Sequence, residues 1–304
     1  GFKRSDVFVI PSNIQVTVET PEGEIITQIR HIESSEPNFD QLDYLNNLCR
    51  YVCQHTPDEN EMREKYLEVI NREPQKRITR YAAGIMGGTG FAVFFGCNLW
   101  DAVIAFIVSV MIVAVGDWLA KRESNLLVYN GILAFISEVI IIGALKMGIA
   151  EHPDRIMIGI VMLLISGLST TNGIRDLLQR DFISGFINIM NSFLGAAGIA
   201  FGIGLAIILF HEGYSDHFIL NHSVPIQLLS CTVACTGFAL WFKIRGKQVW
   251  YNSIGAFFTW AIYVAVYAVK PSNFLATMIA AGFVGFYAFI MSRVNKAPST
   301  IFLT

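Results

Sequence analysis

A cluster of small polar residues closes an apolar run, in the stretch from Ile165 to Asp176. Seven of the eight residues from Ser166 to Gly173 are Ser, Thr, Asn or Gly, and the charged pair of Arg175 and Asp176 follows. Such groups are costly in apolar surroundings unless they meet hydrogen-bonding partners. The chemistry that these residue types offer is the binding of a small polar molecule.

The spacing within this cluster allows two interpretations. Four members stand at i, i+3, i+4 and i+7 and would share one face of a continuous helix: Ser166, Ser169, Thr170 and Gly173. In the first interpretation, small hydroxyl residues let helices pack closely and hydrogen-bond across their interface. In the second, the helix loosens over Ser166–Asn172 and its polar backbone lines a substrate cavity, as in transporters with broken helices.

A single carboxylate, Glu138, lies within another long apolar run, Leu126–Leu145. A carboxylate at membrane depth is costly and is a functional candidate by default. Burial favours its protonated form, so Glu138 is a candidate for binding and releasing a proton. The alternative is a neutral Glu that hydrogen-bonds to another helix. Asn130 and Ser137, seven residues apart, share a face of the same run.

The composition is that of an integral membrane protein. Of the 304 residues, 53% are hydrophobic and 15% are charged, against roughly 25% charged in soluble domains. The mean hydropathy is +0.50. The net charge of −2 is uninformative about nucleic acid, and the chain has no basic run of the kind that binds it. No hydrolase, kinase or nuclease pattern is visible, so we expect no enzyme and no cofactor.

Eight apolar runs are long enough to span a membrane, which takes roughly 20 residues. They are 78–97, 99–119, 126–145, 156–172, 182–210, 224–244, 249–269 and 274–294. Every loop on one side has at least two Lys or Arg residues, and the other side has few. The positive-inside rule therefore places the N-terminus in the cytoplasm, with the spans in the cell (inner or plasma) membrane. Asp101 and Asp117, near the ends of the second run, are interpreted as solvated at the interface.

Residues 1–77 predict a small α+β cytoplasmic domain. The segments 14–19 and 25–30 alternate with period two around Pro21-Glu22-Gly23, which indicates a β-hairpin. Two amphipathic helices follow, the second with Thr56 as its cap and Pro57 at its first position. The acidic residues are interpreted as a solvated face: Asp40, Asp43, Glu59 and Glu61. Cys49, Cys53 and His55 form only part of a metal-binding pattern, so we expect no metal site.

Glycines crowd two of the apolar runs. Gly84, Gly87, Gly88 and Gly90 lie in the first, and Gly198 and Gly202 in the fifth. Small residues at this spacing are typical of closely packed membrane helices. The start of the fifth run also has polar residues that could face the Ser166–Asn172 stretch: Asn188, Asn191 and Ser192.

The chain resembles the threonine/serine exporter family of secondary transporters. That family carries Pro-Gly-x-Pro-x-x-Asn-x-x-Arg-Asp followed by Gly-Asp-x-x-x-Gly. The matching pieces are Ser166-Gly167-Leu168-Ser169-Thr170-Thr171-Asn172-Gly173-Ile174-Arg175-Asp176 and Arg180-Asp181-Phe182-Ile183-Ser184-Gly185. The resemblance runs over nearly all of residues 1–210, and residues 224–304 resemble the start of the family's second module. Both prolines are Ser here, and Asn188 replaces an expected Arg.

The resemblance implies three domains. They are a cytoplasmic domain at 1–77, a five-span transport module at 78–210, and the three-span start of a second module at 211–304, which should continue beyond this chain. Because five is odd, the two modules would be inverted repeats with a substrate site near mid-membrane between them.

We therefore predict a mainly α, polytopic membrane transporter that exports threonine or serine, driven by protons or membrane potential. The predicted substrate contacts are Ser166, Ser169, Thr170, Thr171, Asn172, Asn188 and Asn191. The predicted gate is Arg175, Asp176 and Asp181, and Glu138 couples the proton. Its partners would be the small polar solute and the lipid bilayer, with homo-oligomerisation left open. Two alternatives remain: export of a dicarboxylate such as succinate, and a scaffold or sensor that transports nothing.

Overall fold

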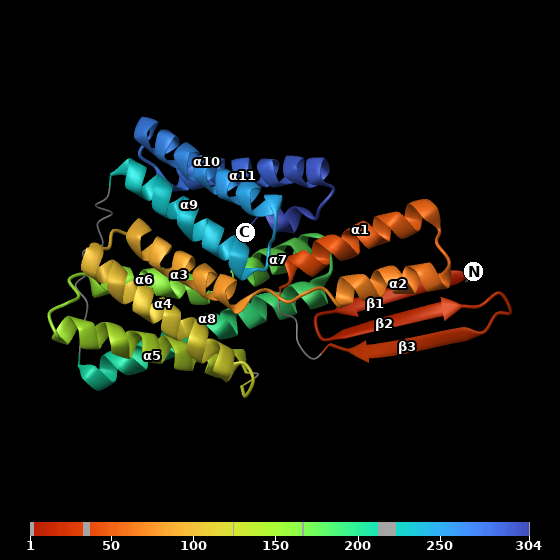
Figure 1. The fold of residues 1–304 in the computed structure, drawn as a ribbon, viewed down its shortest axis with the longest axis horizontal. Coiled ribbons are helices and arrows are strands. Elements are labelled where there is room, and N and C mark those ends of the chain that lie inside the picture. Colours follow the sequence, from red (N-terminus) through yellow and green to blue (C-terminus); the bar gives the residue numbers. More distant parts are fainter. Residues whose placement is uncertain (1–2, 33–36, 124, 166, 212–222, 304) are drawn as a thin grey trace. The chain divides into compact units, whose positions relative to one another are not determined.

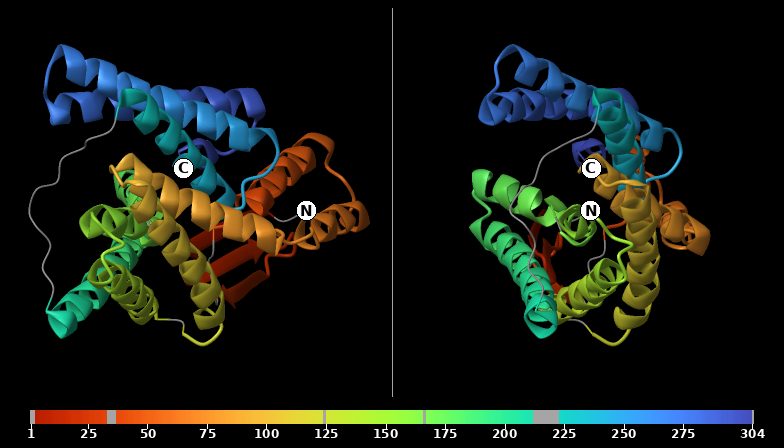
Figure 2. Two further views of the ribbon diagram at one scale, coloured as in Figure 1. Left: turned by 60° about the vertical axis from the view of Figure 1, so that its left-hand side comes forward. Right: turned by 90° about the vertical axis from the view of Figure 1, so that its left-hand side faces the viewer.

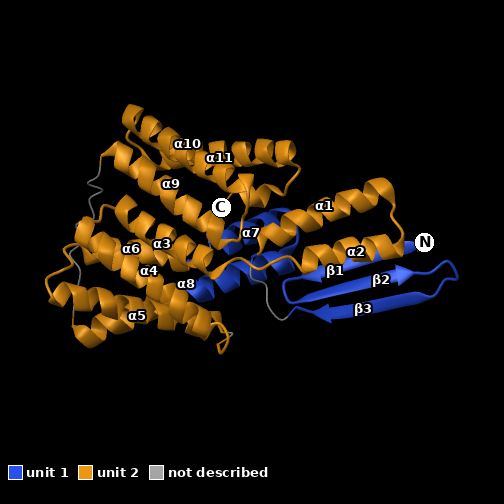
Figure 3. Ribbon diagram, viewed as in Figure 1, with its two compact units in different colours: residues 1–37, 165–197 blue, residues 38–164, 198–304 orange. Residues whose placement is uncertain are grey.

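The structure is a computed structural model that describes residues 3–32, 37–123, 125–165, 167–211 and 223–303. It is mainly helical, with one small sheet near the N-terminus (Figure 1). The chain divides into two compact units, shown in separate colours in Figure 3. The first comprises residues 1–37 and 165–197, and the second comprises residues 38–164 and 198–304.

The sheet of the first unit has three antiparallel strands in the order β1-β2-β3: β1 (Arg4–Ile10), β2 (Asn13–Glu19) and β3 (Ile25–His31). Val16 pairs with Val7 on one side and with Gln28 on the other. The predicted hairpin is confirmed as β2 and β3, with Gly23 in the turn at a φ of 89°. The third strand, β1, comes from the apolar run Val7–Ile10, which has no period-two alternation to reveal it.

The first unit also contains a helical hairpin. It is formed by α7 (Gly167–Leu178) and the N-terminal half of α8 (Phe182–Phe210), joined by a short turn at 179–181. Arg180 adopts a φ of 69° in that turn, a left-handed conformation that lets the chain reverse at once. The reversal places the polar end of α7 against the polar start of α8.

Two amphipathic helices open the second unit: α1 (Phe39–His55) and α2 (Glu59–Ile70). The predicted cap was wrong. Thr56 ends α1 in a left-handed conformation, and Asp58 caps α2 by accepting a hydrogen bond of 2.8 Å from the backbone N of Glu61. Asp58 caps the helix in place of Thr56 because a carboxylate is stabilised at the positive, N-terminal end of a helix.

The prediction that Asp40, in α1, is solvated was also wrong. It is 8% exposed, and its carboxylate accepts bonds of 3.1 and 3.3 Å from Arg72. Arg245 Nη1 lies 3.6 Å away, and the backbone N of Phe39 donates to Phe242 O at 3.2 Å. These bonds join α1 to the segment that follows α9.

The remaining helices of the second unit carry the membrane segments. They are α3 (Arg77–Phe94), α4 (Leu99–Leu119), α5 (Leu126–Lys146), α6 (Pro153–Leu164), α9 (Val224–Trp241), α10 (Lys247–Val269) and α11 (Asn273–Asn295), together with the C-terminal part of α8. A short 3₁₀ helix, η1 (Ser299–Phe302), follows α11.

Six of the described helices are long and apolar enough to span a membrane, and a seventh span results if α6 and α7 form one broken span. The prediction of eight spans was therefore wrong, although the class of fold is confirmed. The first predicted span corresponds to α3, where Arg77, Arg80 and four glycines lower the mean hydropathy. The fourth is interrupted, since α6 has 12 residues and reaches only about 18 Å.

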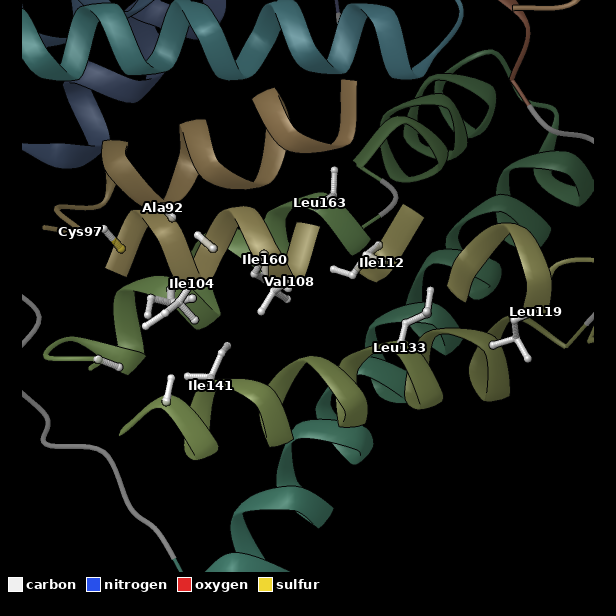
Figure 4. Close-up of a cluster of buried hydrophobic side chains, with 14 residues drawn as sticks. Ala92, Cys97, Ile104, Val108, Ile112, Leu119, Leu133, Ile141, Ile160 and Leu163 are labelled. Carbon is white, nitrogen blue, oxygen red and sulfur yellow. The ribbon is translucent and has the colours of Figure 1, made fainter. Parts of the chain in front are cut away.

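An apolar core joins α3, α4, α5 and α6 (Figure 4). Ile104 and Val108 of α4 contribute to it, as do Leu133 and Ile141 of α5 and Ile160 of α6, each less than 5% exposed. Because stability in lipid comes largely from close packing, this core holds the four helices in register.

The glycine-rich faces pack as predicted. A Cβ at Gly237 of α9 would lie 2.5 Å from the backbone N of Gly87 of α3, and one at Gly90 would lie 3.0 Å from Ala234. The residue numbers of the contacting residues rise along α3 and fall along α9, so the two helices are antiparallel. They lie side by side in Figures 1 and 2. Gly198 and Gly202 of α8 likewise meet the backbone of α5 at Leu127 and Gly131.

Candidate functional site

A polar seam runs between α7 and α8 in the first unit. Thr170 Oγ1 and Ser192 Oγ lie 2.6 Å apart, so one hydroxyl donates to the other. Nearer the turn, Asn188 Nδ2 donates to Asp176 Oδ2 at 3.2 Å. These two bonds bring together residues that are 12 and 22 positions apart, and three of the four residues belong to the predicted site.

Two glycines near these bonds, Gly173 of α7 and Gly185 of α8, let the two helices approach each other closely. A Cβ at Gly173 would lie 3.0 Å from Gly185 O and 2.8 Å from Ile189 Cγ1. A Cβ at Gly185 would lie 2.9 Å from Gly173 O. The backbones are therefore in contact at this level, and larger residues would separate the hydroxyl pair. This geometry matches the first of the two interpretations, close packing with hydrogen bonds across the interface.

The loosening of the helix in the second interpretation is not found over Ser169–Asn172, which lie in the regular helix α7. The interruption comes earlier, between Leu164, where α6 ends, and Gly167, where α7 begins. Ser166 lies outside the described residues. Of the two positions that are proline in the family pattern, Ser169 lies in the first turn of α7, where a proline is also tolerated.

The remaining predicted contacts differ in their exposure. Thr171 is exposed, and its hydroxyl donates to Gly167 O of its own helix at 3.1 Å. Asn191 is exposed on α8, whereas Ser169 and Asn172 are half-buried on α7. Ser192 was noted as a residue that could face this stretch but was not among the predicted contacts, although its neighbour Asn191 was.

Charged residues line the turn end of the seam. Arg175 Nη2 lies 3.4 Å from Asp176 Oδ1, with side chains 50% and 17% exposed. Asp176 thus lies between Arg175 and Asn188. Asp181 is exposed and caps α8, since its Oδ1 accepts a hydrogen bond of 3.2 Å from the backbone N of Ser184. The predicted gating role of these residues stays a prediction.

Glu138 belongs to the second unit, where it is 1% exposed on α5. It lies on a buried stripe with Asn130 and Ser137, whose exposures are 5% and 2%. The hydroxyl of Ser137 donates to Leu133 O at 2.7 Å, within its own helix. Depth and burial agree with the sequence-based candidate, and its role in coupling stays a prediction.

Asp101 is a buried residue whose role the sequence analysis missed. It is 0% exposed, where interfacial solvation was predicted. Its carboxylate accepts bonds from the backbone N of Glu151 at 2.9 Å and of His152 at 3.3 Å, and lies 3.0 Å from His152 Nδ1. With Asn98 it also forms a capping box at the start of α4. The Asn-x-x-Asp spacing is a sequence signal for that cap.

Asp117 is one-third exposed and pairs with Arg80 at 2.8 Å. As to metals, the described residues contain no group of three His, Cys, Asp or Glu side chains placed to hold an ion. Cys49 and Cys53 are exposed, and the ring of His55 stacks on Tyr51.

Long apolar helices, buried polar side chains on several of them and backbone-level glycine contacts define a polytopic α-helical membrane protein. The chain belongs to the threonine/serine exporter family. Residues 1–210 match the family described as a putative threonine/serine exporter, and residues 227–304 match a second model described as threonine/serine exporter, ThrE.

A curated relative, the threonine/serine exporter of Corynebacterium glutamicum, is 25% identical over 182 residues. The match covers 57% of this chain and 37% of that protein, so the chain spans well under half the length of its relative. No solved structure shows a significant match.

Proposed function

We propose that this chain carries the first module and part of the second module of a secondary transporter that exports threonine or serine. The family match over residues 1–210 carries the proposal, and the polar seam between α7 and α8 supplies the candidate contacts, with the hydroxyls of Thr170 and Ser192 2.6 Å apart. The family and the printed name of the relative support the substrate class.

The seam offers groups that match a hydroxy amino acid. Its hydroxyl pair can exchange one internal bond for a bond to the substrate hydroxyl, which keeps every polar group satisfied. Half-buried Ser169 and Asn172 extend this polar surface, and exposed Thr171 and Asn191 lie at its edges. The substrate then replaces hydrogen bonds rather than creating new ones.

The charged end of the seam would act as the gate. Asp176 attracts the substrate's ammonium group and Arg175 its carboxylate, and both are held near the turn that Asp181 caps. Breaking the exposed pair of Arg175 and Asp176 costs about 1 kcal/mol or less, so substrate can compete with it. Loops rich in Lys and Arg support a cytoplasmic position for this end and for residues 1–77.

Glu138 would couple transport to protons. Its carboxyl group is 1% exposed on α5, and a carboxyl group that gains and loses a proton during the cycle would link export to the proton gradient. The antiparallel packing of α3 and α9, the first helices of the two modules, supports an inverted repeat.

The proposal is tested by reconstituting the full-length protein in vesicles and measuring uptake of labelled threonine into inside-out vesicles. We expect excess unlabelled serine to compete and succinate not to compete. Competition by succinate alone would indicate a dicarboxylate exporter. If no solute moves and a soluble partner binds residues 1–77, the protein is a scaffold or sensor and the transport proposal is wrong.

A further inference from the structure

A charged cleft lies within the second unit, where α1 and α2 meet the start of α3 and the segment between α9 and α10. Its volume is about 180 Å³. Six charged residues line it: Asp40, Arg72, Glu73, Arg80, Lys243 and Arg245. They come from four segments that are up to 205 positions apart, so the cleft exists only in the folded protein.

The cleft has a surplus of positive charge. Four of its charged side chains are cationic and two are carboxylates, which leaves a formal excess of two positive charges. One cation, Arg80, already pairs with Asp117 outside this set at 2.8 Å. Two more, Arg72 and Arg245, converge on the single carboxylate of Asp40.

The contacts of Asp40 show that the part of the cleft between Arg72 and Arg245 favours an anion. The carboxylate is 8% exposed, yet it remains bonded to Arg72 at 3.1 and 3.3 Å and lies 3.6 Å from Arg245. Each guanidinium has five N–H donors. Arg72 uses two of them on Asp40, and Arg245 uses one on Glu73 O at 2.8 Å. Donors therefore exceed the acceptors that these bonds supply.

The backbone also places Lys243 in a costly conformation. Its φ is 62°, in the left-handed region that favours glycine. The residue that follows, Ile244, is 1% exposed and anchors the segment, while Lys243 lines the cleft. The conformation ends α9, because the backbone N of Lys243 donates to Leu240 O at 3.0 Å and that of Ile244 donates to Ala239 O at 3.0 Å.

We propose that this cleft binds a phosphate monoester dianion. Such a group carries about two negative charges at neutral pH, which equals the formal excess of the lining before the pairing of Arg80 with Asp117 is counted. Planar guanidinium groups bind phosphate oxygens in pairs, and a lysine ammonium adds a compact point charge. The monoester can belong to a soluble phosphate compound or to the headgroup of a lipid such as phosphatidic acid. The site is independent of the proposed transport function.

Binding is tested on the whole purified chain in neutral detergent with inorganic phosphate as the probe, by calorimetry and by thermal melting at constant ionic strength. We expect saturable binding of phosphate and none of threonine. Lys243→Gln should weaken phosphate binding about tenfold, the loss expected for one charge-assisted hydrogen bond. The matched control is Lys247→Gln, which removes the same charge from an exposed site outside the lining and should change nothing.

A variant that is expected to bind phosphate more tightly distinguishes an effect on binding from an effect on protein stability. Asp40→Asn removes the competing carboxylate and frees N–H donors of Arg72, so phosphate should bind more tightly even if the protein melts at a lower temperature. If Asp40→Asn fails to fold, Glu73→Gln should give the same direction from an exposed position. Equal losses in Lys243→Gln and Lys247→Gln, or weaker binding in both carboxylate variants, would overturn the proposal.

The source of the phosphate is distinguished in phosphatidylcholine nanodiscs with and without phosphatidic acid. If phosphatidic acid competes with inorganic phosphate, the natural ligand is a lipid headgroup. If inorganic phosphate binds equally in both, the ligand is soluble. Stabilisation by threonine to the same extent as by phosphate would show an amino-acid site and contradict the proposal.

Discussion

At the scale of single residues, Thr170 and Thr171 differ in whether the hydroxyl bonds to another helix or to its own helix. Both are threonines of α7, but Thr170 bonds to Ser192 of the next helix, and Thr171 bonds to the carbonyl of its own helix. A residue bonded within its own helix has little to offer a substrate, because its hydroxyl already has a partner that moves with it. The pair therefore makes a matched comparison.

We predict that Thr170→Val raises the KM for threonine about tenfold, the equivalent of one hydrogen bond, because the bond to Ser192 is lost and the substrate loses a contact. Thr171→Val should leave KM within about twofold. Uptake of labelled threonine in vesicles measures both. Equal effects of the two variants would remove the hydroxyl pair from the site.

Glu138→Gln keeps size and burial but cannot change charge. We expect it to abolish export driven by a proton gradient while exchange of threonine across the membrane continues, because only the proton step requires ionisation. Export and exchange are measured in the same vesicles, with the yield of folded protein as control. Wild-type export in the variant would reject the coupling role.

At the scale of helices and strands, short sequence patterns correctly predicted the features that depend on neighbouring residues. The period-two segments formed β2 and β3, and the glycine-rich faces of α3 and α8 pack against other helices. Asp40 and Asp101 were misinterpreted because the partners that bury them are 32 to 205 positions away, and no local pattern reports such distant contacts. Apolar length alone also failed to show that one run ends at Leu164.

The packing of α7 on α8 can be tested through its glycines. Gly173→Ala should destabilise the protein by about 1–3 kcal/mol, since the new methyl group meets backbone atoms of Gly185 and Ile189. Gly204→Ala, where α8 has open space, should be neutral or stabilise by roughly 0.5–1 kcal/mol. Melting in detergent measures the difference, and identical effects would show that the hairpin does not pack this closely.

The junction between α1 and α10 should respond to pH through Asp43. Burial raises the pKa of Asp43 most, a hydrogen bond of 2.9 Å from Gln248 lowers it, and the charge of Asp40 raises it again. Because its pKa is raised, the folded state binds the proton more tightly. This contribution to stability is present below the ordinary pKa of aspartate and is lost as pH rises through the raised value.

Asp43→Asn should therefore raise the melting temperature at pH 7 by roughly 1–3 °C, the shift expected for less than 1 kcal/mol, and should change it little below pH 4. Melting curves of both proteins across this range give the comparison. A gap that is largest at low pH would contradict the assignment.

At the scale of the whole molecule, the antiparallel pair of α3 and α9 joins the two modules of the proposed inverted repeat. Their contact is between backbones, at Gly87 with Gly237 and at Gly90 with Ala234. Where the backbones of two helices touch, no side chains are present to fill the gap that would form if the helices separated. Opening the contact between α3 and α9 would therefore expose backbone to lipid. We therefore infer that α3 and α9 stay together while other helices move.

Crosslinking tests this inference. In a background without the five native cysteines, Gly90→Cys with Ala234→Cys should form a disulfide efficiently, because their Cβ positions are about as close as a disulfide requires. We expect the oxidised protein to keep at least half of its threonine flux, measured before and after reduction in the same vesicles. A flux that disappears on oxidation and returns on reduction would show that the two modules separate along α3 and α9 during transport.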